Sequence, residues 1–250
     1  MAAKLNLYSS IKRLCAAIML SAATIGTASA GQFGISPVAG TLGLGLELDY
    51  AMNDYFSIRL QGNQFNYDDD FEEDDINYKG EIKLSTYGLL VDYHPFSGAF
   101  RLTGGIYSNG NQMSGLANDS GRVEYEIGDA IYTSVPSDPL TLNADVELGN
   151  SSAGYLGLGW GHSPKNTGGL LLSFELGVIF SGEPTIAYQA SGSAQVNVNG
   201  NLQQFSLADT ANPLVAEFYT ELDKEAANLQ DDLSEFKFYP VLKLGIGYRF

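Results

Sequence analysis

Charged side chains of both signs recur at every second position of several segments, opposite large apolar side chains. In residues 41–50, Glu47 and Asp49 alternate with leucines, and in residues 55–65 Arg59 alternates in the same way. A two-residue period is that of a β-strand, whose successive side chains point to opposite faces. The pattern places twelve charged residues on a shared face: Glu47, Asp49, Arg59, Lys79, Glu81, Lys83, Arg101, Asp145, Glu147, Glu175, Lys243 and Arg249. Such a face can form ion pairs, or it can bind and conduct small charged solutes.

The last segment, residues 239–250, has the strongest alternation. Its apolar residues fall on one face: Leu242, Leu244, Ile246, Tyr248 and Phe250. Charged residues and glycines occupy the other face, which is typical of a membrane-spanning β-strand between lipid and a lumen. A final strand that ends on Phe also resembles the signal for insertion of bacterial outer-membrane barrels. We therefore expect Tyr248 and Phe250 to engage the barrel-assembly machinery.

The first 30 residues have the composition of a secretory signal peptide. Three basic residues precede a short apolar run, and an Ala-Ser-Ala sequence ends at Ala30, which predicts cleavage after Ala30. The run is shorter than the about 20 apolar residues that a transmembrane helix needs, and no later segment offers such a stretch. Because only helices and closed barrels satisfy their backbone groups in lipid, residues 31–250 are expected to form a β-barrel in the bacterial outer membrane.

Alternation divides the chain into eight expected strands. Seven are clear and the first is weak: 32–38, 41–50, 55–65, 78–93, 99–109, 140–161, 170–180 and 235–250. The apolar phase shifts near residues 85–87, as a β-bulge would produce. Short and long connections alternate, as in outer-membrane barrels with short periplasmic turns. The sequence thus predicts an all-β fold: an eight-stranded antiparallel transmembrane β-barrel with long extracellular loops and one short loop helix.

Two of the long connections, and one long strand, extend the expected barrel outward. Residues 66–77 form an acidic loop with seven carboxylates: Asp68, Asp69, Asp70, Glu72, Glu73, Asp74 and Asp75. Residues 110–139 form a long mixed loop in which residues 122–132 allow extra strand pairing. Residues 140–161 keep one phase over more residues than a bilayer requires, so their upper half should project beyond the membrane.

The third long connection, residues 181–234, contains an expected helix. Apolar residues recur at spacings of three and four over residues 213–233, as on one face of a helix. Asn212 before Pro213 is a start signal, because Asn caps a helix and Pro suits its first position. We expect this helix to cap the upper barrel; binding of a partner is the alternative.

A subset of the lumen-facing charges are candidate selectivity residues: Glu47, Arg59, Glu81, Lys83, Arg101, Glu175 and Lys243. An eight-stranded barrel is just wide enough to be filled by side chains or to hold one small ligand. Charges of both signs in such a space will pair, because an unpaired buried charge is costly. Two interpretations stay open: a salt-bridged interior that fills the barrel, and a narrow path for small solutes.

Acidic residues dominate the mature chain. Without residues 1–30 it carries 10 basic and 29 acidic residues, a formal charge of −19. This charge argues against nucleic acid as a partner and is compatible with cationic solutes. Oxygen ligands in residues 68–75 suit a hard ion, but the run lacks the spacing of a calcium-binding loop. We expect a solvated loop that attracts cations, and no metal site.

Catalysis has little support in the sequence. A surface hydrolase needs a nucleophile, a base and an orienting group together, whereas His94 and His162 fall in expected periplasmic turns. The only cysteine, Cys15, lies within residues 1–30, so the mature chain has no disulfides or thiol chemistry. We expect no enzymatic activity and no cofactor.

Several stretches within roughly the last 100 residues carry a family resemblance: YLGLGW at 155–160, GEP at 182–184, and DKEAANLQD at 223–231 leading into FYPVLKLG at 238–245. They resemble a family of small eight-stranded outer-membrane proteins of Gram-negative bacteria, the CarO type, which is associated with uptake of ornithine and basic amino acids. The resemblance implies a monomeric barrel with a narrow or occluded interior. The acidic run departs from the family pattern, so the resemblance does not extend to a substrate.

Two hypotheses follow for function. The first, favoured by the family resemblance, is a narrow passive channel for small, cationic solutes. The second is a non-conducting barrel that stabilises the envelope or presents its loops to a partner. Both place the chain in contact with the lipid bilayer and lipopolysaccharide.

Overall fold

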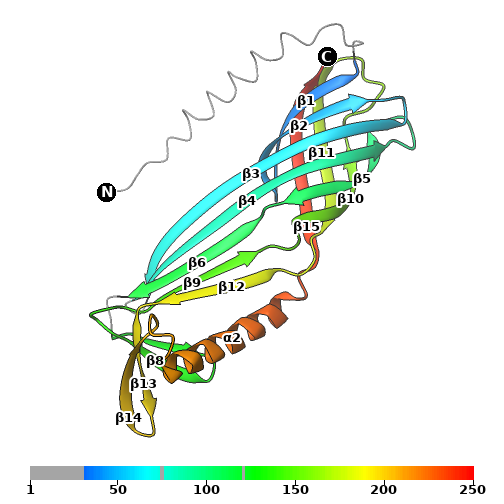
Figure 1. The fold of residues 1–250 in the computed structure, drawn as a ribbon. Helices are drawn as coiled ribbons and strands as arrows, with labels where there is room; N and C mark the ends of the chain where they lie inside the picture. The colour runs from blue at the N-terminus through cyan, green and yellow to red at the C-terminus, as the bar shows by residue number, and fades with distance from the viewer. Residues whose placement is uncertain (1–30, 74–75, 120–121) are drawn as a thin grey trace, which may run out of the picture.

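The computed structural model describes residues 31–73, 76–119 and 122–250, so the expected signal peptide, residues 1–30, lies outside the described residues. The described chain is all-β with one helix (Figure 1). It has fifteen strands, more than the eight that the sequence predicted. Eight of them form the barrel wall: β1 (Phe33–Gly40), β2 (Gly43–Ala51), β3 (Phe56–Glu73), β4 (Ile76–Tyr93), β5 (Phe100–Asn109), β10 (Ser152–Trp160), β11 (Gly169–Phe180) and β15 (Tyr239–Arg249).

Antiparallel pairing joins these strands into a closed ring. Each of β1 to β4 pairs with the next strand, β5 pairs with β10, β10 with β11, β11 with β15, and β15 returns to β1. A closed ring leaves no unpaired strand edge within it. The first strand, which has the weakest sequence signal, is essential to closure because it joins β2 to β15.

Beyond the ring, β3 and β4 continue into an open sheet. With β6 (Gln112–Asp119), β9 (Thr141–Glu147) and β12 (Thr185–Ser191) they form what we call the extended sheet, in the order β3-β4-β6-β9-β12 (Figure 1). Residues 66–77 are therefore not the open loop that the sequence predicted, because Asn66 to Glu73 belong to β3 and Ile76 to β4. The long segment 140–161 is divided between β9 in the extended sheet and β10 in the ring.

The expected β-bulge near residues 85–87 is absent from the β3–β4 pairing. The two strands pair residue for residue from Phe56 with Tyr93 to Glu73 with Ile76. The apolar phase shifts because the environment changes along a regular strand. Within the ring the outward side chains, such as Leu89, are the apolar ones, whereas beyond it the opposite face packs onto a second core through Ile76.

This second core lies at the end of the molecule away from the ring, which we call the distal half (Figure 1). A four-stranded sheet has the order β14-β13-β8-β7, formed by β7 (Glu124–Ile127), β8 (Ala130–Ser134), β13 (Ser193–Val198) and β14 (Asn201–Ser206). The helix α2 (Pro213–Leu233) packs Val215, Phe218 and Leu222 against it. The prediction of extra strand pairing in residues 122–132 is thus confirmed, as is the helix, whose first turn is capped by the Asn212 side chain at 3.0 Å from the Leu214 amide.

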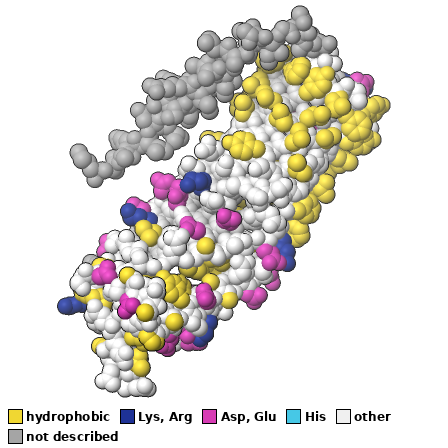
Figure 2. Space-filling model, viewed as in Figure 1, with side chains coloured by type: hydrophobic (Ala, Val, Ile, Leu, Met, Phe, Trp, Pro, Cys, Tyr) yellow, Lys and Arg dark blue, Asp and Glu magenta, His cyan; other side chains and the backbone are white. Residues whose placement is uncertain are grey.

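Side chains segregate along the length of the molecule. Figure 2 shows hydrophobic side chains gathered over the ring and most charged side chains over the distal half. The exposed belt includes Leu44, Leu60, Leu89, Ile106, Leu156, Leu172, Leu244 and Ile246. The 11 residues of β15 extend about 36 Å, or about 28 Å of height at a tilt of about 40°. Among the described residues, no helix has the length and apolarity to cross a membrane.

Removing an aromatic side chain from the distal core should destabilise the distal half and leave the barrel wall unchanged. Phe218 is fully buried and lies 4.9 Å from Tyr132, centroid to centroid, so Phe218→Ala should destabilise the distal half by about 3–5 kcal/mol. Hydrogen exchange should accelerate in α2, β13 and β14, and not in the ring. The matched control is Phe236→Ala, because Phe236 is 65% exposed; similar exchange in both variants would contradict this description of the core.

Candidate functional site: the interior of the ring

Arg59 is the centre of the ring interior. Its guanidinium contacts three carboxylates: Nε lies 2.5 Å from Asp92, Nη1 2.8 Å from Glu47 and Nη2 2.7 Å from Glu175. The side chains of all four residues are fully buried. The planar fork of arginine suits this arrangement, since its five donors reach several acceptors in one plane.

One of these ion pairs crosses the ring. Arg59 projects from β3 and Glu175 from β11. In the ring order β1-β2-β3-β4-β5-β10-β11-β15, these two strands are four places apart, on opposite walls. A direct contact of 2.7 Å therefore joins side chains from opposite walls across the interior.

Two further cations complete the middle of the network. Arg101 on β5 pairs with Glu175 at 2.6 Å and donates to the Gly161 carbonyl at 3.0 Å. Lys243 on β15 lies 2.7 Å from Glu47 and 3.3 Å from Glu175, and donates to Gln61 at 2.8 Å. Both glutamates are thus shared between cations from different strands.

A second cluster of charged residues lies at the end of the ring near the C-terminus. Arg249 pairs with Asp49 and donates to the Ser163 carbonyl at 2.6 Å. The buried His162 ring lies between two carboxylates, with Nδ1 3.0 Å from Asp49 and Nε2 3.1 Å from Glu47. His162 therefore joins this cluster to the network around Arg59.

The buried charges balance. Four carboxylates (Glu47, Asp49, Asp92 and Glu175) face four cations (Arg59, Arg101, Lys243 and Arg249), with His162 between two of the acids. Burying one charge without a partner is strongly unfavourable, and removing one member of a buried pair costs about 3–5 kcal/mol. The network therefore depends on all its members being present together.

An apolar layer covers the distal side of the ionic network. Leu42, Leu90, Ala153, Ile179 and Val241 are buried there, with the rings of Tyr107 and Tyr155 packed edge to face at 5.4 Å. The two hydroxyls reach into the polar region: Tyr155 donates to Glu175 at 2.7 Å and Tyr107 to Gln61 at 2.9 Å. A charged solute moving along the axis would have to cross both layers.

The structure brings five of the seven candidate selectivity residues together. Glu47, Arg59, Arg101, Glu175 and Lys243 lie in the network, whereas the placement of Glu81 and Lys83 in the lumen was wrong. Both lie on β4 beyond the ring, where Glu81 and Lys83 pair at 3.2 Å with side chains 44% and 48% exposed. Together with Asp145 and Glu147 they line a groove of about 430 Å³ on the extended sheet. Lys79, also expected in the lumen, lies on the same exposed part of β4.

Two residues of the network, Asp92 and His162, were not predicted from the sequence. Asp92 alternates correctly with Leu89 and Val91, but the supposed bulge hid its phase. His162 carries no strand signal, because it lies in a turn with a φ of 54°. Only the folded ring brings that turn beneath Asp49.

The remaining predicted residues lie outside the interior. Asp68, Asp69, Asp70 and Glu72 are exposed on β3, Glu73 ends that strand, and Asp74 and Asp75 lie outside the described residues. Among the described residues, no group of three His, Cys, Asp or Glu is arranged to hold a metal. Tyr248 and Phe250 are exposed and their rings lie 5.3 Å apart.

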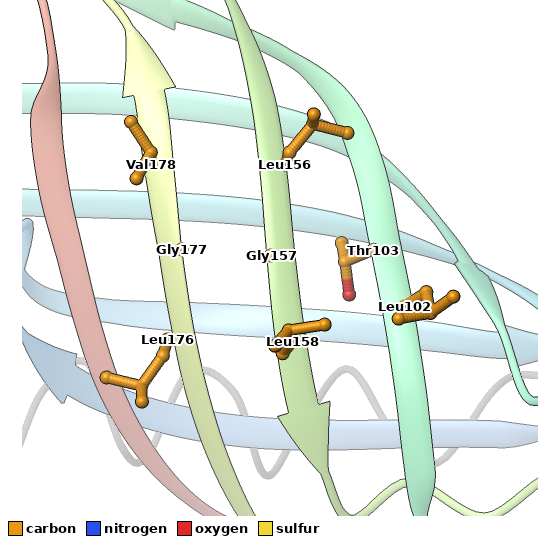
Figure 3. A pocket seen from close by; sticks show the side chains of 8 residues that line it. All are labelled: Leu102, Thr103, Leu156, Gly157, Leu158, Leu176, Gly177 and Val178. Atoms are coloured by element: carbon orange, nitrogen blue, oxygen red, sulfur yellow. The ribbon is translucent and has the colours of Figure 1, made fainter.

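An apolar groove lies on the outside of the wall, away from the ionic network. It encloses about 570 Å³ above the paired glycines Gly157 and Gly177. Figure 3 shows that Leu156, Leu158 and Leu176 flank these glycines on neighbouring strands. The groove is a hollow in the apolar belt and has no part in the polar interior.

The network predicts unequal effects of removing two cations. Arg59→Met leaves Glu47, Asp92 and Glu175 short of a partner and should lower the free energy of unfolding by about 3–5 kcal/mol. Lys83→Met removes the cation of the exposed pair with Glu81 and should change the free energy of unfolding little. Urea unfolding in lipid vesicles, followed by tryptophan fluorescence, measures both. Equal losses would contradict the assignment of Arg59 as the centre of the network.

Comparison with solved structures identifies relatives of this fold. The chain is similar to "Crystal Structure of Acinetobacter baumannii CarO", with a TM-score of 0.52 and 19% identity over 88% of this chain and 98% of that one. It is also similar to "Crystal structure of Acinetobacter baumannii CarO2", with a TM-score of 0.52 and 18% identity over 89% and 100% of the two chains. No family model matches the chain, and no curated protein matches it. The chain therefore resembles the CarO-type barrels in fold, as the sequence predicted.

Proposed function

We propose that the protein is an outer-membrane β-barrel with a closed interior, which presents the extended sheet, the four-stranded sheet and α2 outside the cell. In this role the barrel anchors a structural or partner-binding surface and has no enzymatic activity. The ion pair between Arg59 and Glu175 carries the proposal, because it joins opposite walls of the ring at 2.7 Å. A barrel blocked in this way would act through the surface that it presents outside the membrane.

Three observations support the outer membrane as the location. The apolar belt has about the height of the band found on transmembrane barrels, and the ring closes without a free edge. The fold is that of CarO-type barrels. In this location the belt contacts lipid, the sheet just beyond it meets lipopolysaccharide, and Tyr248 and Phe250 present the insertion signal to the assembly machinery. Because the ring is complete within one chain, we expect a monomer.

A narrow passive channel for small, cationic solutes is the second candidate. The buried hydroxyls of Ser36 and Ser173 have no hydrogen-bond partner among the described residues, and buried polar groups of this kind commonly hold water. Conduction would then require Glu47, Arg59, Arg101, Glu175 and Lys243 to exchange partners as a solute passes. The apolar layer around Leu90 opposes such a path.

Single-channel recording in planar bilayers tests the proposal. We expect no conductance steps from the folded wild-type barrel. The charge-balanced variant Arg101→Ser/Glu175→Ser removes the crossing acid and should raise ion leakage, while Glu81→Gln/Lys83→Met, which alters only the exposed pair, should stay silent. Salt-dependent, cation-selective steps from the wild type would overturn the proposal in favour of the channel.

The membrane assignment predicts the effect of a charge in the belt. Leu244 is 59% exposed at the middle of β15, so Leu244→Arg should lower the free energy of unfolding in lipid vesicles by about 2–4 kcal/mol. Leu202→Arg is the matched control, since Leu202 is 68% exposed on distal strand β14 and should tolerate the charge to within about 0.5 kcal/mol. An equally small loss of stability in both variants would contradict the claim that the apolar belt contacts lipid.

A further inference from the structure

The part of β3 beyond the ring is a free strand edge. Its partner β2 ends its pairing at Leu44 with Gln64, and from Asn66 to Glu73 the described strand pairs only with β4. Every residue from Gln64 to Glu72 is exposed. Figure 1 shows this segment as the outer border of the extended sheet. A row of backbone donors and acceptors along one side of β3 is therefore open to another strand.

The two faces of this edge have different chemistry. Phe65, Tyr67 and Phe71 lie on the face of β3 that points into the lumen within the ring, and they are 42–54% exposed. Asp69 lies on this same face, between Tyr67 and Phe71. Asp68, Asp70 and Glu72 continue the opposite face. An added strand would thus place alternate side chains beside aromatic rings and beside carboxylates, since neighbouring side chains on one face of a sheet lie about 4.5–5.5 Å apart.

The carboxylates of the edge carry a surplus of negative charge. Among the described residues, no ion pair reaches Asp68, Asp70 or Glu72. Asp68 stands directly opposite Glu81 on β4, whereas Asp70 stands opposite Lys79 and Glu72 opposite Asn77. Like charges in opposed positions destabilise a pair of strands, so the repulsion is at Asp68. Positive side chains on an added strand would relieve this repulsion.

Acidic residues on an edge strand can also serve only to prevent aggregation. That role needs no large apolar groups, and exposing Tyr67 and Phe71 beside the acids works against it. Phe71 also stacks on Tyr78 at 5.1 Å, which joins the edge to the distal core. A second copy of this chain is a poor occupant, because its own acidic edge would be repelled.

From this juxtaposition we infer that the free edge of β3, residues 65–72, binds a basic, extended polypeptide segment by strand addition. The bound segment alternates lysine or arginine, facing Asp68, Asp70 and Glu72, with apolar residues facing Phe65, Tyr67 and Phe71. Backbone hydrogen bonds supply the register, and the alternating side chains supply the specificity. Eight residues of edge accommodate about 27 Å of partner strand. The inference rests on the proposed function in one respect, namely that the extended sheet faces outward.

Peptide binding to the folded full-length mature barrel in detergent micelles tests the inference. The probe is a fluorescein-labelled peptide amide of four Lys-Val repeats, and the readout is fluorescence anisotropy at low and high salt. Its backbone control carries N-methyl groups on alternate residues, which keep the charge but prevent strand pairing. We expect the plain peptide to bind and the methylated peptide to bind at least about tenfold more weakly.

Two matched triple variants locate the binding surface. Asp68→Asn/Asp70→Asn/Glu72→Gln should weaken binding about tenfold, as three exposed ion pairs together would. Asp223→Asn/Glu225→Gln/Asp232→Asn makes the same charge change at three exposed positions of α2 and should alter binding less than twofold. Unboiled gel mobility checks that both variants are folded.

Other results would overturn the inference. Equal binding of plain and methylated peptides, or equal weakening by both triple variants, would mean diffuse electrostatic attraction. No binding at low salt, or dimers that compete with the peptide in sedimentation, would exclude a basic partner strand. None of these results bears on conductance, so failure here and failure of the closed-barrel proposal are distinguishable.

Discussion

Charge neutrality inside a ring whose opposite walls are joined by side-chain contacts is the constraint on which this structure depends. Carboxylates and cations enter the interior from six strands, and all of them are buried, with at most a few per cent of their surface exposed. Each must find its counter-charge on another strand, often on the far wall. Because Arg59 reaches acids on β2, β4 and β11, neutrality and closure of the barrel are satisfied by the same contacts.

This constraint separates the roles of the two halves. The ring is apolar outside and ionic inside. The distal half has its own apolar core around Phe218 and carries most of the exposed charge. The extended sheet joins the halves, since β3 and β4 run without interruption from one to the other. Its open edge is where the molecule offers unpaired backbone together with charge.

Period-two alternation predicted seven of the ring strands, although it joined β9 and β10 into one segment, and the alternation of short and long loops called for the first strand. Apolar spacing and cap chemistry predicted the helix at Pro213–Leu233. Alternation did not tell where a strand leaves the ring, because the periodicity of β4 is the same on both sides of that point. Glu81 and Lys83 were misplaced for this reason, and the change in apolar phase was mistaken for a bulge. His162 was unpredictable from local sequence, since its role arises from a turn that packs against β2 from 113 positions away.

The division of the interior into an ionic and an apolar layer also depends on three-dimensional register. Leu90 and Asp92 lie two positions apart on β4, yet they belong to different layers. Which layer each joins is set by residues on other strands, such as Tyr155 and Arg59. A sequence of alternating residues specifies which side chains point inward, and the stagger of the closed ring specifies which of them meet.

Exchange of the Arg59 Nε hydrogen with solvent tests the central claim most directly. In the folded barrel this hydrogen points at Asp92 across 2.5 Å, within a fully buried network. Nuclear magnetic resonance of the barrel in micelles should show an Arg59 Nε–H signal that persists at neutral to mildly alkaline pH and exchanges far more slowly than that of the exposed Arg122. Exchange of Arg59 as fast as that of Arg122 would mean that water reaches the centre of the ring, and would contradict a closed interior.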